Sequence, residues 1–526
     1  MKCPMRSKMF VSSFILLLTC INYLHAQTRL PKEFETYVES VIEQFETPGI
    51  SIAVVHNGSI LFAKGYGRRG VGTNIKVDEN TLFGIGSNTK AFTATAIGIL
   101  VEEGKLQWDD LVIKYLPWFR LSDPYVTSNI TIRDLLVHHS GLGLGAGDLL
   151  WWPKSTYTRK EIISRLQYIP LKTSFRSTYA YDNVLYLVAG AVIEAISNET
   201  WENFITNHIL LKLGMKYSNA YLSSINKEEN IALPHVKING TLKTITPDDA
   251  DIINPAGGIN SCATDMAKWL LCQLDSGKVS NGSKIFIPNT TRELWRMITP
   301  RQISEPPKEL SYTKENFKGY ALGFGVSDYR GRKLIRHYGG LPGYISEVAM
   351  IPEIKLGIAV LTNQETYACD VITDYIMDYF LNAQPEDYIS AYKLHVARID
   401  SLNNNEVSQS TMKRNTESHP SLALEKYTGT FTDAWYGDVK IELKDGKLII
   451  SFSHTPLLIG TLEHFQYDTF IIRWNDSELR ADAYITFALN PDGSIDQVKM
   501  KAVSPATDFS YDFQDLLLKP VTKNGK

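Results

Sequence analysis

The distribution of strand-forming segments constrains the fold of this chain more than any other feature. Residues 49–67 alternate around Asn57-Gly58, which is a strong signal for a β-hairpin. Far along the chain, RKLIRHYG (332–339), SEVAMIP (346–352) and KLGIAVLTN (355–363) have the pattern of three successive strands. Helical spacing precedes the hairpin and follows the last strand, at 367–381. We therefore predict an α+β fold, in which a helical region from the middle of the sequence packs on an antiparallel sheet that joins both ends.

A second, all-β pattern occupies residues 421–520. Hairpin signals occur at Asp445-Gly446 and Asp492-Gly493, and EHFQYDTFIIRW (463–474) adds a further strand. This pattern predicts a small antiparallel barrel or sandwich. Before it, residues 386–402 have helical character, whereas NNNEVSQSTMKRNTESHP (403–420) contains few apolar residues and is typical of a linker.

The N-terminus has the features of a signal peptide. A basic start precedes the apolar run 9–24, and Ala26 supplies a small residue for cleavage. The run is short for a membrane span; an uncleaved anchor or a lipid at Cys20 are the alternatives. We predict a signal peptide at 1–26, a first domain at 27–384, a helix and polar linker at 385–420 and a C-terminal β domain at 421–520. The mature protein is then periplasmic or secreted, with no membrane span.

Charge and cysteine content exclude several classes of function. The net charge is −3 and the chain has no long cluster of Lys and Arg, so we expect no nucleic-acid partner. After signal cleavage three cysteines remain, Cys262, Cys272 and Cys369. Their odd number and their spacing suit neither a metal site nor a disulfide framework. We expect three buried apolar thiols and no metal.

The most informative local motif is Ser87-x-x-Lys90. The same pattern also occurs in polar or charged segments, at Ser224, Ser311, Ser390 and Ser410. Only Ser87 follows a strand-like stretch and opens a long apolar helix, where positions i and i+3 share a face and the helix N-terminus favours an oxyanion. Burial would lower the pKa of Lys90 and make a neutral amine accessible. The alternative is that Ser87 caps the helix and Lys90 extends to solvent.

A hydroxyl needs partners to become a nucleophile. Tyr181-x-Asn183 lies at the mouth of an apolar helix, whereas the second such motif, at Tyr217 and Asn219, resembles a helix exit. The alternative for Tyr181 and Asn183 is a turn with a helix cap.

A His-x-Gly motif occurs three times, at His56, His139 and His337. His337-Tyr338-Gly339 lies on strand-like sequence that runs into glycines, where a ligand can approach the backbone closely. The N–H of Gly340 could then form an oxyanion hole with that of Ser87. The alternative is a histidine that merely ends a strand.

The three motifs, in this order, resemble those of the penicillin-recognising serine hydrolases, in particular the class C β-lactamase and DD-peptidase-like group. LLVHHSGL (135–142), LGMK (213–216) and PAGGINSCATDMAKWL (255–270) are also similar to family landmarks, and the resemblance covers residues 33–381. The C-terminal β domain resembles a domain of uncharacterised role that often follows such hydrolases. An α/β-hydrolase is disfavoured because the chain has no Gly-x-Ser-x-Gly.

The resemblance implies roles for these residues and no cofactor. Ser87 would form an acyl-enzyme, with Lys90 and Tyr181 sharing proton transfer, and either could be the base. Substrate would be bound by Asn183, His337, Gly339 and Gly340. The expected protein is an exported serine hydrolase of an amide or ester, its substrate a small peptide, an ester or a β-lactam. The alternative is a penicillin- or peptide-binding protein with slow or no turnover. No oligomeric state is predicted.

The third motif departs from the Lys-Thr-Gly of many β-lactamases. Because His337 stands where the lysine would bind a substrate carboxylate, a neutral imidazole would hold that carboxylate less strongly. A peptidase or esterase is therefore at least as plausible as a β-lactamase. Trp151 and Trp152 are expected either to line the cleft or to serve packing.

Overall fold

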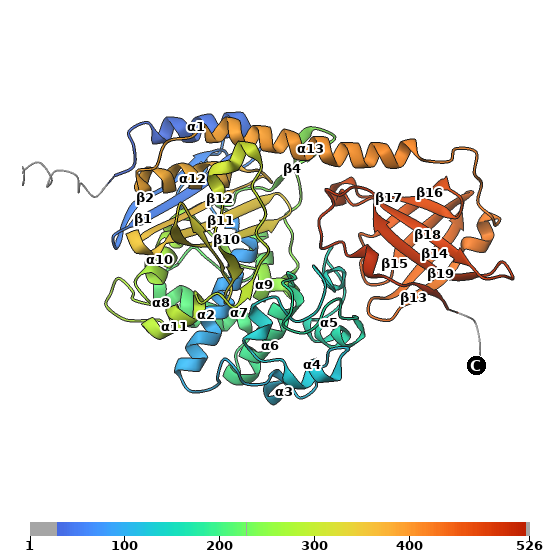
Figure 1. The fold of residues 1–526 in the computed structure, drawn as a ribbon, viewed down its shortest axis with the longest axis horizontal. Helices are drawn as coiled ribbons and strands as arrows, with labels where there is room; N and C mark the ends of the chain where they lie inside the picture. Colours follow the sequence, from blue (N-terminus) through green and yellow to red (C-terminus); the bar gives the residue numbers. More distant parts are fainter. Residues whose placement is uncertain (1–28, 228, 522–526) are drawn as a thin grey trace, which may run out of the picture.

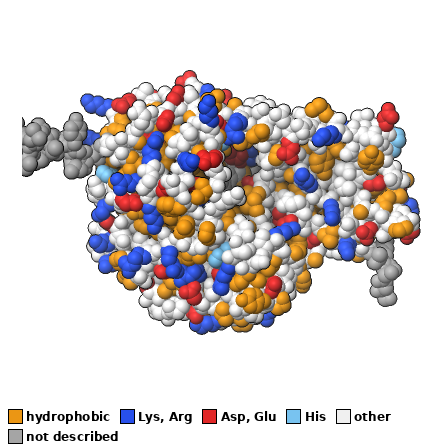
Figure 2. Space-filling view, viewed as in Figure 1, with side chains coloured by type: hydrophobic (Ala, Val, Ile, Leu, Met, Phe, Trp, Pro, Cys, Tyr) orange, Lys and Arg blue, Asp and Glu red, His pale blue; other side chains and the backbone are white. Residues whose placement is uncertain are grey.

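The computed structural model describes residues 29–227 and 229–521, so the predicted signal peptide lies outside the described residues. Figure 1 shows an α/β body and a separate β body, with one long helix, α13, passing from the first to the second. On the face seen in Figure 2, basic and acidic side chains are both widely spread. Within the described ranges, none of the helices combines the length and the apolar character that crossing a bilayer requires.

The first domain contains an eight-stranded antiparallel sheet that joins the two ends of its sequence, as predicted. Strand β1 pairs with β2 on one side and with β12 on the other, where Ile50 lies opposite Thr362 and His56 opposite Leu356. In spatial order the strands are β2 (Ser59–Gly67), β1 (Gly49–His56), β12 (Leu356–Thr362), β11 (Tyr344–Ile351), β10 (Arg332–Leu341), β9 (Gly325–Tyr329), β8 (Lys318–Tyr320) and β7 (Thr299–Pro300).

Helices cover both faces of this sheet, which explains the continuous apolar sequence of β1. Ile50, Ile52 and Val54 pack with α1 (Phe34–Phe45) and α12 (Ala368–Leu381), whereas Ala53 and Val55 pack on the opposite face with α10 (Ala263–Leu274). The alternation of strand side chains sends successive residues into these two layers.

The helical region packs around α2 (Thr89–Glu102) and α6 (Val184–Ser197). Small residues let neighbours approach α2 closely: a Cβ on Gly98 would lie 2.6 Å from a Thr290 methyl group. The shorter helices of this region are α3 (Val112–Tyr115), α4 (Pro124–Asn129), α5 (Arg159–Arg165), α7 (Trp201–Ile205), α8 (Leu211–Leu213), α9 (Asn254–Gly257) and α11 (Pro288–Leu294).

The C-terminal domain is a nearly closed antiparallel barrel. Its strands follow the order β19-β18-β17-β16-β15-β14-β13-β20, and a bridge between Val498 and Leu518 brings the two edges together. The strands are β13 (Gly429–Asp433), β14 (Gly437–Lys444), β15 (Lys447–Phe452), β16 (Ile459–Gln466), β17 (Thr469–Trp474), β18 (Ala483–Leu489), β19 (Ile495–Ala502) and β20 (Lys519–Pro520).

Two elements differ from the sequence prediction. EHFQYDTFIIRW forms a hairpin rather than one strand, because Tyr467 adopts a left-handed conformation (φ 48°) and turns the chain with Asp468. Helix α13 runs from Tyr388 to Met412, through half of the expected linker. Its first half is anchored by Tyr388 and Tyr392, and its polar second half bridges the domains, which is a common role for a helix that is polar all round.

Candidate active site

A tight turn places Ser87 between the helical region and the sheet. Ser87 lies in the 3-10 turn η1 (Gly86–Asn88), which leads directly into α2. Gly86 has φ 50°, and a Cβ there would lie 2.8 Å from the nitrogen of Gly340 on β10. A Cβ on Gly339 would lie 1.8 Å from the carbonyl oxygen of Ile85. Glycine at both positions therefore lets the turn lie directly against β10.

Lys90 is fully buried beneath Ser87. Its Nζ lies 2.8 Å from Ser87 Oγ and donates to Asn183 Oδ1 (2.8 Å) and to the carbonyl oxygen of Ala256 (3.0 Å). It also lies 4.8 Å from the centre of the Tyr181 ring. The alternative in which Lys90 extends to solvent is wrong. Burial lowers the pKa of Lys90 to about 7, although the negative charge of Asp148 opposes the change.

Tyr181 and Asn183 lie just before α6 and face this lysine. Asn183 occupies the N-cap position, yet its side chain makes no cap hydrogen bond. Instead its Oδ1 accepts from Lys90, and its Nδ2 donates to Asp148 Oδ2 at 2.8 Å. Burial raises the pKa of Tyr181 well above its ordinary value, although a hydrogen bond with Ser87 opposes the change. The phenol of Tyr181 therefore stays protonated at neutral pH.

His337 lies on β10 and is a neutral imidazole. Burial lowers its pKa to about 3, and the charge of Lys90 adds to the effect. Nδ1 lies 2.6 Å from the carbonyl oxygen of Tyr338, which can only accept, so Nδ1 carries the proton. Nε2 then accepts from the Tyr320 hydroxyl at 2.7 Å. His337 therefore presents a ring without charge.

The glycines after His337 have different surroundings. Leu341 and Tyr344 form the hydrogen-bonded pair that closes a two-residue turn between β10 and β11. Because hydrogen-bonded and non-hydrogen-bonded pairs alternate in an antiparallel ladder, the next pair, Gly340 and Ile345, is not hydrogen-bonded, and the N–H of Gly340 points away from β11. On its other side β9 stops pairing at Gly325, and the N–H of Gly340 faces the cleft. Gly339 is buried against Ile85 and is not one of the described residues that line the cleft. Its position favours close packing rather than substrate contact.

A cleft of about 1200 Å³ brings five of the predicted residues together. Ser87, Tyr181, Asn183, His337 and Gly340 all line it, and Lys90 lies behind Ser87. Trp151 and Trp152 line it as well. The C-terminal domain contributes a further part of the wall, namely Leu457, Asp476, Glu478, Leu479, Arg480, Ala506, Asp508, Phe509, Ser510 and Tyr511. The cleft is thus built by both domains.

The cationic side chains of the cleft differ in their partners. Four of them make ion pairs, namely Lys154 with Asp249, Lys318 with Glu315, Arg336 with Glu347 and Arg480 with Glu365. Arg301 makes no ion pair with any described residue, and its guanidinium lies 4.5 Å from the centre of the Tyr179 ring. A positive charge that has no carboxylate partner among the described residues therefore faces the cleft.

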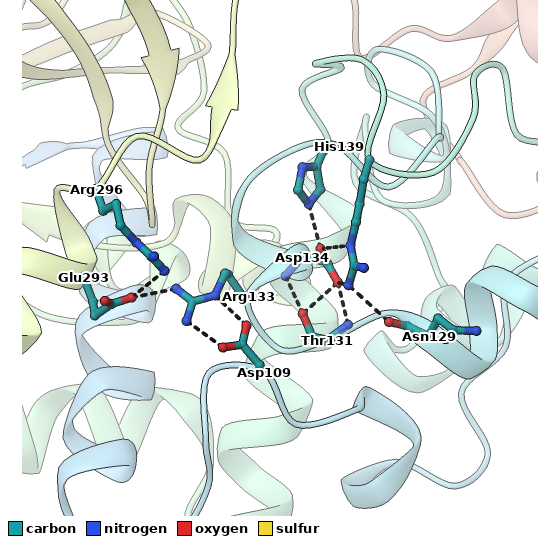
Figure 3. Close-up of polar contacts among 9 residues, drawn as sticks. Asp109, Asn129, Thr131, Arg133, Asp134, His139, Glu293 and Arg296 are labelled. Atoms are coloured by element: carbon teal, nitrogen blue, oxygen red, sulfur yellow. Dashed lines mark hydrogen bonds and ion pairs between the residues drawn. The ribbon is translucent and has the colours of Figure 1, made fainter.

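The other copies of the motifs lie elsewhere. Asn219 bonds with Ser224 and Asn260, away from Lys90. His139 Nε2 bonds with the carboxylate of Asp134 at 2.7 Å (Figure 3). Its Nδ1 lies 3.1 Å from Thr299 Oγ1. His139 therefore ties the helical region to the edge strand β7.

Sequence reasoning missed Asp148, Ser510 and Tyr320. Asp148 is fully buried and accepts from Asn183, and Ser510 Oγ donates to it at 3.0 Å from the C-terminal domain. No motif marks these residues, because their partners lie far away in the sequence. The three remaining cysteines are buried and free, as expected. Among residues 29–227 and 229–521, no cluster of three or more His, Cys, Asp or Glu side chains suits a metal ion.

Known proteins resemble this chain in sequence and in fold. Unguisins hydrolase ungD of Aspergillus violaceofuscus is 29% identical over 499 residues, covering 89% of this chain and 87% of the relative. Protein flp of Staphylococcus aureus strain MW2 is 24% identical, covering 67% of this chain and 66% of the relative. The octameric penicillin-binding protein homologue from Pyrococcus abyssi superposes with a TM-score of 0.57 at 22% identity, covering 93% of this chain and 99% of that structure.

The fold and these relatives define a serine hydrolase related to penicillin-binding proteins. Residues 34–378 match the Beta-lactamase family model, and the chain belongs to this family. Residues 413–520 match a domain of unknown function, DUF3471.

Proposed function

We propose that Ser87 is the nucleophile of this hydrolase and that neutral Lys90 is its general base. The supporting observation is the set of partners around Lys90 Nζ. Two of the three, Asn183 Oδ1 and the Ala256 carbonyl, can only accept hydrogen bonds. A neutral amine has two protons for them, so its lone pair faces the third partner, the hydroxyl of Ser87. Tyr181 is the weaker candidate for the base, because burial keeps its phenol protonated.

The reaction then proceeds through an acyl-enzyme. Lys90 takes the proton of Ser87 as Oγ attacks the substrate carbonyl, and the N–H groups of Ser87 and Gly340 stabilise the oxyanion. Tyr181, on the same wall of the cleft, donates a proton to the leaving group, and the proton that Lys90 took from Ser87 replaces it, so that both residues regain their resting forms. Water then releases the acyl group from Ser87.

The experiment is intact-mass spectrometry after exposure to a fluorophosphonate and, separately, to a penicillin. We expect wild-type protein to gain one adduct and Ser87→Ala to gain none. A lasting penicillin adduct with little ester hydrolysis would support the alternative of a slowly turning over penicillin- or peptide-binding protein. Adduct formation in Ser87→Ala would exclude Ser87 as the nucleophile.

For the substrate we propose a small amide or ester that carries a carboxylate. His337 supplies no charge, whereas Arg301, which has no ion-pair partner among the described residues, offers a guanidinium that binds carboxylates well. The relative named as an unguisins hydrolase supports a hydrolytic activity for this site. The test compares two esters of equal size, one with a free carboxylate and one with the corresponding primary amide. Arg301→Gln should raise KM for the first about 10- to 100-fold and leave the second unchanged. Equal effects on both would contradict the assignment.

We also propose that the protein is exported. The support is the basic and apolar pattern of residues 1–26. N-terminal sequencing of the protein from the host's periplasm or medium should begin near Gln27. A cytoplasmic protein that retains Met1 would exclude export.

A further inference from the structure

The C-terminal domain reaches the site through the segment that links β19 to β20, residues 503–518. Both carboxylate oxygens of Asp512 in this segment accept backbone N–H groups of the first domain, from Gly147 at 2.7 Å and from Leu149 at 3.1 Å. Asp512 is fully buried. The segment therefore clamps the backbone on both sides of Asp148.

The carboxylate of Asp148 accepts three hydrogen bonds of its own. Oδ1 accepts from Trp151 Nε1 (2.9 Å), and Oδ2 accepts from Asn183 Nδ2 (2.8 Å) and from Ser510 Oγ (3.0 Å). A carboxylate that accepts from Nδ2 fixes the orientation of the Asn183 amide. The carbonyl end of that amide then has to face Lys90, as observed.

We propose that Asp148 is the positioning residue that orients Asn183 and Lys90, and that Ser510 and Asp512 of the C-terminal domain hold it in place. The C-terminal barrel then contributes residues that position the hydrolase site. This inference rests on the proposed function of Ser87 and Lys90. The hydrogen bonds form one continuous path from Ser510 through Asp148, Asn183 and Lys90 to Ser87.

The charges around Asp148 set the expected pH dependence. Lys90 is the neighbouring cation, and the other neighbours are Asp182, Asp512 and the phenol of Tyr181. Burial raises the pKa of Asp182 and of Asp512 well above the usual range, and burial also keeps the proton on Tyr181. Burial raises the pKa of Asp148 itself to about 7, although hydrogen bonds from Trp151, Asn183 and Ser510 and the charge of Lys90 oppose the rise. In its ionised form Asp148 raises the pKa of Lys90, so removing its charge should lower that pKa.

The test uses the full-length protein and p-nitrophenyl acetate as the reporter ester. Asp148→Asn replaces one acceptor oxygen by a donor, so the amide of Asn183 loses its fixed orientation. We expect kcat to fall about 100-fold and the acid limb of the kcat/KM profile to move to lower pH. Ser510→Ala removes one donor to Asp148 and should lower kcat about 3- to 10-fold, with a smaller shift of the limb in the same direction.

Ser504→Ala is the matched control, because Ser504 lies in the same segment and its Oγ bonds only with the N–H of Ala506 among described residues. It should retain the wild-type rate and pH profile. Thermal melts identify variants that do not fold. If Asp148→Asn does not fold, the kinetics of Ser510→Ala alone decide whether the positioning role holds. If both variants are folded and keep the wild-type profile, the positioning role is excluded. The role of Ser87 would still stand in that case, because its fluorophosphonate adduct reports it independently.

Discussion

Lys90 is the residue whose protonation we expect to control the rate. Burial lowers its pKa to about 7, so the neutral amine becomes the major form above that pH. We predict that kcat/KM for p-nitrophenyl acetate rises through about pH 7 and then levels off. Lys90→Met, which is similar in length but cannot accept a proton, should lower kcat by a factor of about 100 to 10,000 at every pH. A profile that is flat between pH 5 and 8.5 would contradict the role of Lys90 as base.

Asp134 is a residue on which we expect stability to depend. Burial alone would raise the pKa of Asp134, but hydrogen bonds from His139, Arg176 and Thr131 outweigh burial and hold the pKa well below its ordinary value. Its stabilising effect is therefore fully present above about pH 4, the unfolded pKa, and is lost as pH falls toward the folded pKa. Asp134→Asn should lower the free energy of unfolding by about 2–4 kcal/mol at pH 7, and by less at pH 3.

Urea denaturation at pH 7, 5 and 3 measures this difference. Asp109→Asn is the control, because Asp109 pairs with Arg133 in the same region but its side chain is 71% exposed (Figure 3). A pair with one largely exposed member should contribute less than about 1 kcal/mol. If the two variants lose equal stability, or if the effect of Asp134→Asn grows as pH falls, the explanation is wrong.

At the scale of elements, the contact between the η1 turn and β10 decides where Ser87 lies. A Cβ on Gly339 would lie 1.8 Å from the Ile85 carbonyl oxygen and 2.5 Å from Ser346 Oγ, so one element must move. We predict that Gly339→Ala lowers the melting temperature by several degrees and slows fluorophosphonate labelling of Ser87 about 10-fold or more. On Gly340 a Cβ would meet only a methyl group of Ile345, at 3.7 Å. Gly340→Ala should therefore melt within about 1 °C of wild type, and equal melting of both variants would contradict the steric argument.

The sequence patterns of individual helices and strands predicted most of the fold, and the errors in that prediction have physical causes. Hairpins such as β1–β2 and β14–β15 were predictable because Asn57-Gly58 and Asp445-Gly446 encode their turns locally. The β16–β17 turn was not, because Tyr467 adopts its left-handed conformation only within the tertiary structure, where its N–H donates to Ser418. Helix α13 was predicted too short, because its polar half gains order from the domains at its two ends.

The site was predictable only where its residues belong to motifs. Ser87, Lys90, Tyr181, Asn183 and His337 were found from local context and order in the chain. Asp148 and Ser510 lie 362 positions apart, and neither stands in a recognisable pattern. Their contact follows from how the two domains dock, which no local sequence signal encodes.

At the scale of the whole molecule, buried contacts rather than surface ion pairs should couple the two domains. Tyr157 of the first domain is buried, stacks on His454 of the barrel at 3.9 Å and donates a hydrogen bond to the Tyr436 carbonyl. The ion pair of Arg480 with Glu365 also joins the domains, but its side chains are 38% and 32% exposed. Partly exposed ion pairs contribute little to stability, whereas removing a buried aromatic ring costs about 3–5 kcal/mol.

Differential scanning calorimetry at neutral pH can separate these contributions. We predict one cooperative transition for the wild type, because the barrel supplies contacts that the first domain needs around Asp148 and Tyr157. Tyr157→Ala should divide this transition into two, as the domains begin to unfold separately, whereas Arg480→Ala should shift it by no more than about 2 °C. Tyr157→Phe keeps the stacked ring and loses only the hydroxyl, so it should retain a single transition at a slightly lower temperature. If Arg480→Ala separates the domains and Tyr157→Ala does not, the interface is electrostatic, and its stability should then fall with added salt.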